Sequence, residues 1–231
     1  LDVAEARGFR TGSNPVTVIR NANVLPKVKR GDLHHKALPH KDMAVFWTLL
    51  DAKTDNSVTA FKLLILTAAR TSEILGMDWA EVDLDRALWT VPADRMKAGR
   101  AHDVPLSTVA VDLLKERIRV LGSEGLVFQG QKPGKPLSNM SLLAMLRRLK
   151  MADRTTAHGM RSTFRDWAGE SGVDRTLAEA ALAHSVGNKV EAAYARSTMI
   201  EQRRPVMQSW ANYVTEVKGD DVVVPIRSVS A

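Results

Sequence analysis

A row of cationic and titratable side chains stands out in residues 155–170, which read TTAHGMRSTFRDWAGE. If this segment is a helix, His158, Arg161 and Arg165 share one face, because their spacing is i, i+3 and i+7. Neighbouring cations repel one another by about a few tenths of a kcal/mol per exposed pair, so the row suggests a bound anion. A solvated helix face is the simpler interpretation, and the row alone favours neither.

Further short motifs accompany this row in a fixed order along the chain. The chain has two tyrosines, and one of them follows a Leu-Ala-His segment. The residues that carry the pattern are Arg70 in AARTSE, Lys97 in MKAGR, His158 with Arg161, His184 in LAHSVGN, and Tyr194. In this order they resemble the tyrosine recombinase (phage integrase) family, and most closely the integrases of prophages and genomic islands. The resemblance covers about residues 40–215.

Positive charge is the main catalytic resource for transferring a phosphodiester to a tyrosine, because the transition state spreads negative charge over the equatorial oxygens. Arginine suits this task since its planar fork donates two hydrogen bonds to phosphate and stays protonated. We expect Arg70 and Arg161 to bind the two non-bridging oxygens. A phenol with a reference pKa near 10 is only about one part in a thousand ionised at neutral pH. Tyr194 therefore needs a cationic pocket or a base, and His158 is the candidate base or orienting residue.

The resemblance assigns roles to three more residues. Lys97 matches the general acid of the family, which protonates the 5′ oxygen of the DNA as it leaves. His184 matches a residue that hydrogen-bonds the phosphate and helps to fix the segment of Tyr194. Glu73 matches the acidic residue that supports the first arginine without taking part in the chemistry. No metal and no other cofactor is required, because the two arginines and Lys97 already supply positive charge.

Helical periodicity dominates the elements that must position these residues. Apolar residues recur at helical spacing in residues 41–53, 57–69, 107–121, 138–151 and 155–170. Thr71 or Ser72 can cap a further helix, and Pro205 is expected to lie in the first turn of another. Residues 87–107 differ, because two strand-like runs flank a turn. We therefore predict a mainly α fold with a small antiparallel β-hairpin or sheet, an α+β class that matches the tyrosine recombinase catalytic domain.

The chain is expected to have three parts. Residues 1–36 carry turn and charge signals and are interpreted as the C-terminal remnant of a core-binding domain plus a linker. Residues 37–217 form the catalytic domain, and residues 218–231 form a C-terminal tail. The chain opens at Leu1 without a basic and apolar leader, so we expect no secretory signal and infer an N-terminus cut from a longer protein.

Three histidines near the linker could form a metal cluster. His34, His35 and His40 are close in sequence, but no cysteine and no paired carboxylates accompany them. They are therefore better interpreted as linker residues.

Composition limits the class of protein. The 231 residues contain 33 Lys and Arg against 26 Asp and Glu, a net charge of +7 that favours a polyanionic partner. The absence of cysteine excludes disulfide frameworks, thiol catalysis and Cys-ligated zinc. The most apolar run, residues 63–69, is far shorter than the roughly 18 residues of a membrane span. We expect a cytoplasmic protein associated with the bacterial nucleoid.

The resemblance implies a site-specific DNA recombinase that cleaves and rejoins DNA through a covalent 3′-phosphotyrosyl intermediate, for integration or excision of a mobile element. It implies double-stranded DNA attachment sites as partners, a homotetramer in the synaptic complex, a monomer or dimer when free, and accessory partners such as a DNA-bending protein and an excisionase. Two alternatives stay open, a type IB topoisomerase-like relaxing activity and a DNA-binding protein that has lost catalysis. Each candidate residue alone has an ordinary structural interpretation, and their joint order favours the active site.

Overall fold

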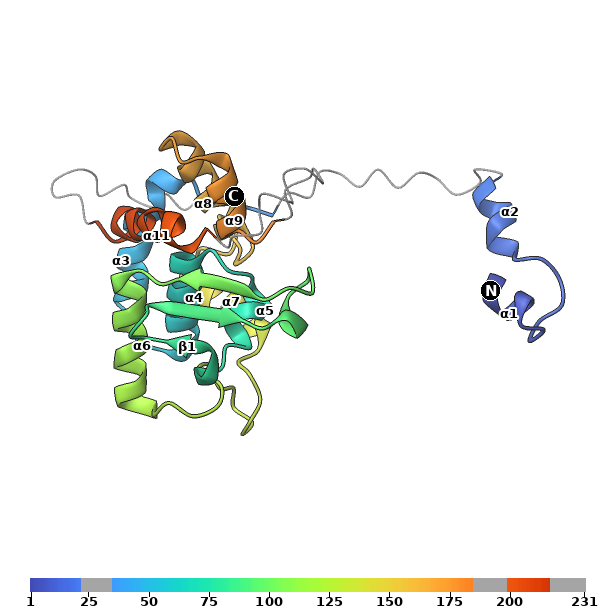
Figure 1. The fold of residues 1–231 in the computed structure, drawn as a ribbon, viewed down its shortest axis with the longest axis horizontal. Coiled ribbons are helices and arrows are strands. Elements are labelled where there is room, and N and C mark those ends of the chain that lie inside the picture. The colour runs from blue at the N-terminus through green and yellow to red at the C-terminus, as the bar shows by residue number, and fades with distance from the viewer. Residues whose placement is uncertain (22–34, 185–198, 217–231) are drawn as a thin grey trace. The chain divides into compact units, whose positions relative to one another are not determined.

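The chain divides into two units, Leu1–His34 and His35–Ala231, which are described separately. The computed structural model describes residues 1–21, 35–184 and 199–216 (Figure 1). In the first unit, two short helices, α1 (Asp2–Ala6) and α2 (Pro15–Asn21), lie in a segment for which the sequence predicted only turns and charges. Asn14 joins them, since its amide donates to Asp2 Oδ1 at 2.8 Å while its Oδ1 accepts from the Val16 N–H.

Helices form most of the larger unit (Figure 1). The α-helices of its described part are α3 (Met43–Asp51), α4 (Asn56–Thr67), α5 (Thr71–Leu75), α6 (Thr108–Leu121), α7 (Asn139–Arg148), α8 (Gly159–Glu170), α9 (Arg175–Ala181) and α11 (Ile200–Thr215). The 3-10 turns are η1 (His40–Asp42), η2 (Trp79–Glu81) and η3 (Ala93–Arg95), and the strands are β1 (Val82–Asp83), β2 (Leu88–Val91) and β3 (His102–Pro105). The predicted α+β class is confirmed.

Short polar side chains begin several of these helices. The Asp55 carboxylate accepts the N–H groups of the first turn of α4, and the Ser107 hydroxyl does the same for α6. Asp174 caps α9 in the same way. Each cap satisfies N–H groups that have no partner within the helix, which contributes about 1 kcal/mol and fixes where the helix starts.

Two of the expected helix starts are wrong. Arg70, and not Thr71 or Ser72, is the N-cap of α5, because the Glu73 carboxylate reaches back to the Arg70 N–H at 2.8 Å. Pro205 lies inside α11 and not in its first turn. A proline there removes one helical hydrogen bond, and the buried face of α11 supplies enough contact to keep the helix continuous.

The sheet is antiparallel in the order β1-β2-β3, so the predicted hairpin is present and gains a short third strand. Trp89 is fully buried at its centre, facing Val82 on one side and Val104 on the other. On the opposite face, the Thr90 hydroxyl donates to Asp103 Oδ1 across the strands at 2.7 Å. The connection from β2 to β3 forms a long turn at the edge of the unit.

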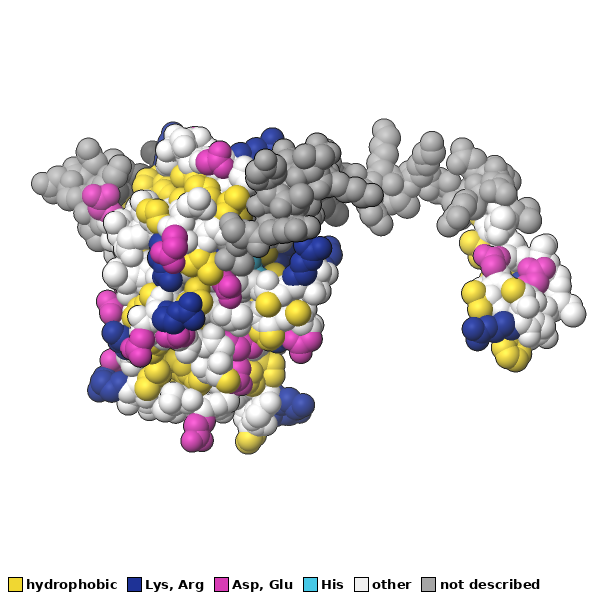
Figure 2. All heavy atoms as spheres, viewed as in Figure 1, with side chains coloured by type: hydrophobic (Ala, Val, Ile, Leu, Met, Phe, Trp, Pro, Cys, Tyr) yellow, Lys and Arg dark blue, Asp and Glu magenta, His cyan; other side chains and the backbone are white. Residues whose placement is uncertain are grey.

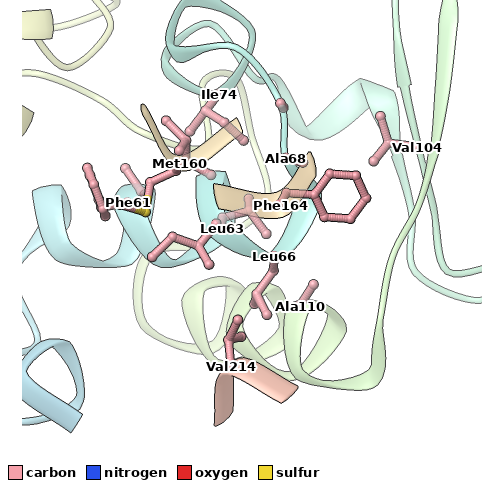
Figure 3. Close-up of a cluster of buried hydrophobic side chains, with 14 of the residues drawn as sticks. Phe61, Leu63, Leu66, Ala68, Ile74, Val104, Ala110, Met160, Phe164 and Val214 are labelled. Carbon is pink, nitrogen blue, oxygen red and sulfur yellow. The ribbon is translucent and has the colours of Figure 1, made fainter. Parts of the chain in front are cut away.

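Helix α4 lies at the centre of the core, in contact with α3, α5, α6, α7, α8 and α11. Figure 3 shows Phe61, Leu63 and Leu66 of this helix surrounded by side chains from other elements. Its neighbours there are Ile74, Val104, Ala110, Met160, Phe164 and Val214. Helix α11 is also tied to α4 by a hydrogen bond of 2.8 Å from Trp210 Nε1 to the Ile65 carbonyl. Helices α8 and α11 therefore both pack directly on α4.

The surface of the larger unit carries charges of both signs. On the face shown in Figure 2, Lys and Arg side chains are interspersed with Asp and Glu and form no single cationic patch. Within the described residues, none of the helices has the length and apolar character that crossing a membrane demands.

Candidate active site

Arg70 is positioned by the sharp turn between α4 and α5. The turn is made at Ala68, whose φ of +50° is left-handed and costs an alanine about 1 kcal/mol or more. The Arg70 guanidinium donates to Glu73 Oε1 at 2.7 Å, and Glu73 is only 2% exposed. Because the same carboxylate also accepts from the Arg70 N–H, Glu73 fixes both the main chain and the side chain of this arginine.

Arg161 is the more deeply buried of the two arginines, at 5% exposure in the first turn of α8. It donates to the Ala68 carbonyl at 2.5 Å and to the Leu182 carbonyl at 2.6 Å. Arg70 donates to the next carbonyl along the chain, that of Ala183, at 3.4 Å. The structure therefore brings the two predicted arginines together through adjacent carbonyl groups.

These carbonyls lie at the C-terminal ends of α4 and α9, which carry partial negative charge. They offset the repulsion between two cations held in one site. Burial, followed by the nearby charge of Arg70, lowers the pKa of Arg161 to about 10, while Glu73 and Glu179 act in the opposite direction. Arg161 therefore stays charged at neutral pH.

His184 is placed by the end of α9. The helix closes with Ala183 in the left-handed region at a φ of +48°, while the His184 N–H donates to the Glu179 carbonyl and the Ala183 N–H to that of Ala180. This pair of hydrogen bonds is the Schellman ending, in which the residues at the two ends of the longer bond also meet through their side chains. Glu179 and His184 accordingly contact each other, with 2.6 Å between Oε2 and Nδ1. On its other side, His184 Nε2 lies 3.1 Å from Arg161 Nη2.

His158 is the N-cap of α8 and has an exposed side chain. Its ring lies against that of His35, with 4.5 Å between the ring centroids. The pKa of His158 is lowered by the partial burial of its ring, next by His35, and further by Arg161, Arg70 and His184. His158 is therefore neutral at neutral pH, which is the form that can accept a proton.

Arg165 does not join the other members of the predicted cationic row. Its guanidinium lies 2.8 Å from Glu179 Oε1, and its side chain is 52% exposed. Arg161 points into the domain instead, so the row is divided between an ion pair at the surface and a buried guanidinium that donates to main-chain carbonyls.

The structure does not bring Lys97 to these residues. Lys97 is exposed on the turn between η3 and β3, and no hydrogen bond or ion pair of this side chain to another described residue is found. The predicted nucleophile, Tyr194, lies outside the described residues, as do the linker residues 22–34.

Glu179 was not expected from the sequence, and the linker interpretation of His40 is wrong. Glu179 could have been found from its place five residues before His184 at the end of a helix. His40 is not a linker residue, because it is buried with Nδ1 2.8 Å from the Tyr213 hydroxyl and Nε2 3.0 Å from Glu170 Oε2. His35 lies against the ring of His158, a contact that the sequence did not indicate. Across the parts of the chain that the structure describes, no three His, Asp or Glu side chains are grouped as metal ligands would be.

Comparison with known families matches residues 38–201 to "Phage integrase family". The chain belongs to the phage integrase family. The matched range contains all seven residues proposed from the sequence, and the predicted family is confirmed.

Curated integrases are similar over much of this chain. Prophage integrase IntA of Escherichia coli (strain K12) is 36% identical over 165 residues, which are 71% of this chain and 40% of the relative. Prophage integrase IntZ of the same strain is 36% identical over 80% of this chain and 46% of its own length. The integrase of Enterobacteria phage P4 is 34% identical over 87% of this chain and 49% of its own length. The chain thus spans less than half the length of these relatives.

Solved integrase structures share the fold. The integrase from mycobacterium phage Brujita superposes with a TM-score of 0.60 at 19% identity, over 92% of this chain and 72% of the other. The Tn1549 transposon integrase, in complex with transposon right end DNA, superposes with a TM-score of 0.55 at 17% identity. The match covers 78% of this chain and 73% of the other. At these identities the likeness concerns the fold of the integrase family alone.

Proposed function

We propose that this chain is the catalytic part of a site-specific DNA recombinase that transfers a DNA phosphodiester to Tyr194. The observation that carries the proposal is the pair of half-buried Arg70 and buried Arg161, held by helix C-terminal carbonyls with His158 and His184 beside them. Such a concentration of donors with fixed directions stabilises charge that develops on phosphate oxygens.

The chemistry balances with the residues at hand. The Tyr194 oxygen attacks the scissile phosphorus, and the phenolic proton passes to neutral His158. The bond from phosphorus to the 5′ oxygen breaks, and Lys97 donates a proton to that oxygen. Arg70 and Arg161 neutralise the non-bridging oxygens, and the product is a 3′-phosphotyrosyl bond. A 5′ hydroxyl of another strand then reverses these steps and rejoins the DNA without an external energy source.

The wider context is part of the same proposal. Residues 37–217 act as the catalytic domain, residues 1–36 as the end of a core-binding domain with its linker, and residues 218–231 as a tail. The partners are double-stranded attachment sites on nucleoid DNA, a homotetramer during synapsis, and accessory proteins that bend DNA or direct excision. The names of the relatives, which are prophage integrases, support this assignment.

Covalent capture of DNA tests the proposal. The substrate is a nicked duplex of the element's own junction sequence, in which cleavage releases a short oligonucleotide and prevents religation. We expect the wild-type protein to form a complex that survives denaturation, and Tyr194→Phe to bind the duplex without forming it. Tyr213→Phe is the matched control and should capture DNA, because Tyr213 contacts His40 in the core.

Three results would reject the assignment. Capture by Tyr194→Phe would show that another residue is the nucleophile. A wild-type protein that binds the junction but never captures it would be a DNA-binding protein without catalysis, and relaxation of plasmids without site preference would favour a topoisomerase.

A further inference from the structure

A short segment at the start of the larger unit, residues 35–38, lies along the first turn of α8 and is called the strap here. The Lys36 carbonyl accepts from the Thr156 N–H at 3.1 Å and from the Thr156 hydroxyl at 3.4 Å. The Leu38 carbonyl accepts from the Thr163 hydroxyl at 2.6 Å, and Leu38 is buried. The strap is thus fastened to both sides of the turn that carries His158 and Arg161.

Gly159 permits this close approach. A Cβ atom at this position would lie 2.0 Å from the Lys36 carbonyl oxygen and 2.8 Å from its carbon, both main-chain atoms. The Gly159 N–H in turn donates to the Thr156 hydroxyl at 2.9 Å. Any larger residue would push the strap away from α8, so the glycine directly after His158 serves the contact with the strap.

The strap also touches the candidate base directly. The ring of His35 lies against the ring of His158, with 4.5 Å between centroids and 59° between planes. His158 is an exposed N-cap residue and makes no side-chain capping hydrogen bond. The His35 ring therefore restricts how the His158 imidazole can turn.

We propose that the strap holds His158 in position for proton transfer, with His35 as a positioning residue. This inference rests on the proposed function, because it takes His158 as the group that receives the tyrosine proton. A base held in the correct orientation accepts the proton faster than one that must first rotate into place. Small displacements at a reacting site lower the reaction rate.

The charges around His158 give the proposal a second readout. The groups that face it are His35, Arg161, Arg70 and His184, and together with partial burial they lower its pKa. Loss of the His35 ring exposes His158 and removes one of these groups. The pKa of His158 then rises toward its ordinary value, so the neutral base is lost at a higher pH and the acid limb of the cleavage rate moves upward.

Three variants of the whole protein separate positioning from other effects. His35→Ala removes the ring, whereas His35→Phe keeps a ring without a titrating group. Lys36→Ala is the control, because residue 36 contacts the start of α8 through its main-chain carbonyl, which this substitution keeps. We expect His35→Ala to slow single-turnover capture at saturating DNA about tenfold. His35→Phe should restore most of the rate, and Lys36→Ala should leave it unchanged.

The titration of His158, followed by NMR of its ring protons in the free protein, completes the test. His35→Ala should move its midpoint to a higher pH, whereas Lys36→Ala should not. Full capture by His35→Ala with an unmoved titration would overturn the strap proposal, as would equal slowing by Lys36→Ala. A wild-type protein that captures no DNA would overturn the proposed function instead, which the Tyr194 experiment detects separately.

Discussion

Arg161 and His184 are joined by a hydrogen bond of 3.1 Å from the guanidinium to Nε2 of the imidazole. A guanidinium can only donate, so Nε2 must be the accepting nitrogen and the proton of the neutral ring lies on Nδ1. That proton is directed at Glu179 Oε2, 2.6 Å away. The two hydrogen bonds of His184, to Glu179 and to Arg161, therefore fix one tautomer of its ring and direct Nε2 toward the arginine pair.

Removing the carboxylate should release this tautomer. In Glu179→Met the Nδ1 proton has no acceptor, the other tautomer becomes available, and its Nε2–H would meet the Arg161 donor. We expect capture to slow about 10- to 100-fold, the usual effect of losing a residue that orients a functional histidine. Glu179→Gln keeps an oxygen acceptor and should keep most of the rate. ¹⁵N NMR of the ring nitrogens reports the tautomer of His184 in each variant.

A surface carboxylate provides the control for Glu179. Glu116 also pairs with an arginine, Arg119, but both are well exposed on α6. Glu116→Gln should leave capture and the His184 spectrum unchanged. Equal slowing by Glu179→Gln and Glu179→Met would mean that the charge of Glu179 matters and not its role as an acceptor.

Two glycines of α8 should respond to alanine in opposite directions. Gly159→Ala places a Cβ against the Lys36 carbonyl, and such overpacking costs about 1–3 kcal/mol of the free energy of unfolding. At Gly169 a Cβ meets no atom within 4 Å, and alanine there should stabilise the helix by about 0.5–1 kcal/mol. Urea unfolding of both variants measures the difference. A Gly159→Ala protein as stable as the wild type would show that the strap moves without cost.

The sequence predicted the elements better than the contacts within the site. The apolar stripe of Met160, Phe164 and Trp167 indicated α8 because burial imposes the helical period on side chains. The partners of Arg161 carry no such signal, since they are main-chain carbonyls at the ends of two other helices. The left-handed turn at Ala68 could not be predicted either, because glycine or asparagine is the residue expected in that conformation.

Long-range partners explain the errors near the N-terminus of the larger unit. His40 and Tyr213 are 173 residues apart in the chain, and nothing local in a polar, proline-containing segment indicates that His40 is buried. The family was predictable because the order of its motifs along the chain is distinctive. The support of Arg70 by Glu73 was expected from the family resemblance. The orientation of His184 depends on Glu179, whose role follows from a helix end that only the fold defines.

His102 on β3 should make the stability of the larger unit depend on pH. Burial, and next the charge of Arg203, lower the pKa of His102 to about 4, although Glu73, Asp103 and a backbone hydrogen bond to Ala181 oppose the shift. The unfolded chain takes up this proton near pH 6.5, whereas the folded chain does so only near pH 4. The stabilisation is therefore complete above pH 6.5 and is lost as the pH falls toward 4.

A neutral replacement isolates this effect from other titrating groups. Between pH 6.5 and 4 the wild type should lose up to about 1 kcal/mol per pH unit relative to His102→Gln, measured by urea unfolding at each pH. Above pH 7 the difference between the two proteins should be constant. Parallel curves over the whole range would mean that His102 takes up its proton equally in the folded and unfolded chains.

Lys97 should matter only when the leaving group needs a proton. Lys97→Ala is expected to slow cleavage of an ordinary junction about 10²- to 10⁴-fold, because an alkoxide is a poor leaving group without a general acid. Sulfur in place of the bridging 5′ oxygen leaves as a thiolate, which is stable near neutral pH, so this substrate should restore most of the rate. Arg100→Ala, an exposed cation on the same turn, is the control and should slow neither substrate at saturating DNA. If Lys97→Ala is equally slow on the sulfur substrate, Lys97 acts on the phosphate or on DNA binding and the proton comes from another group.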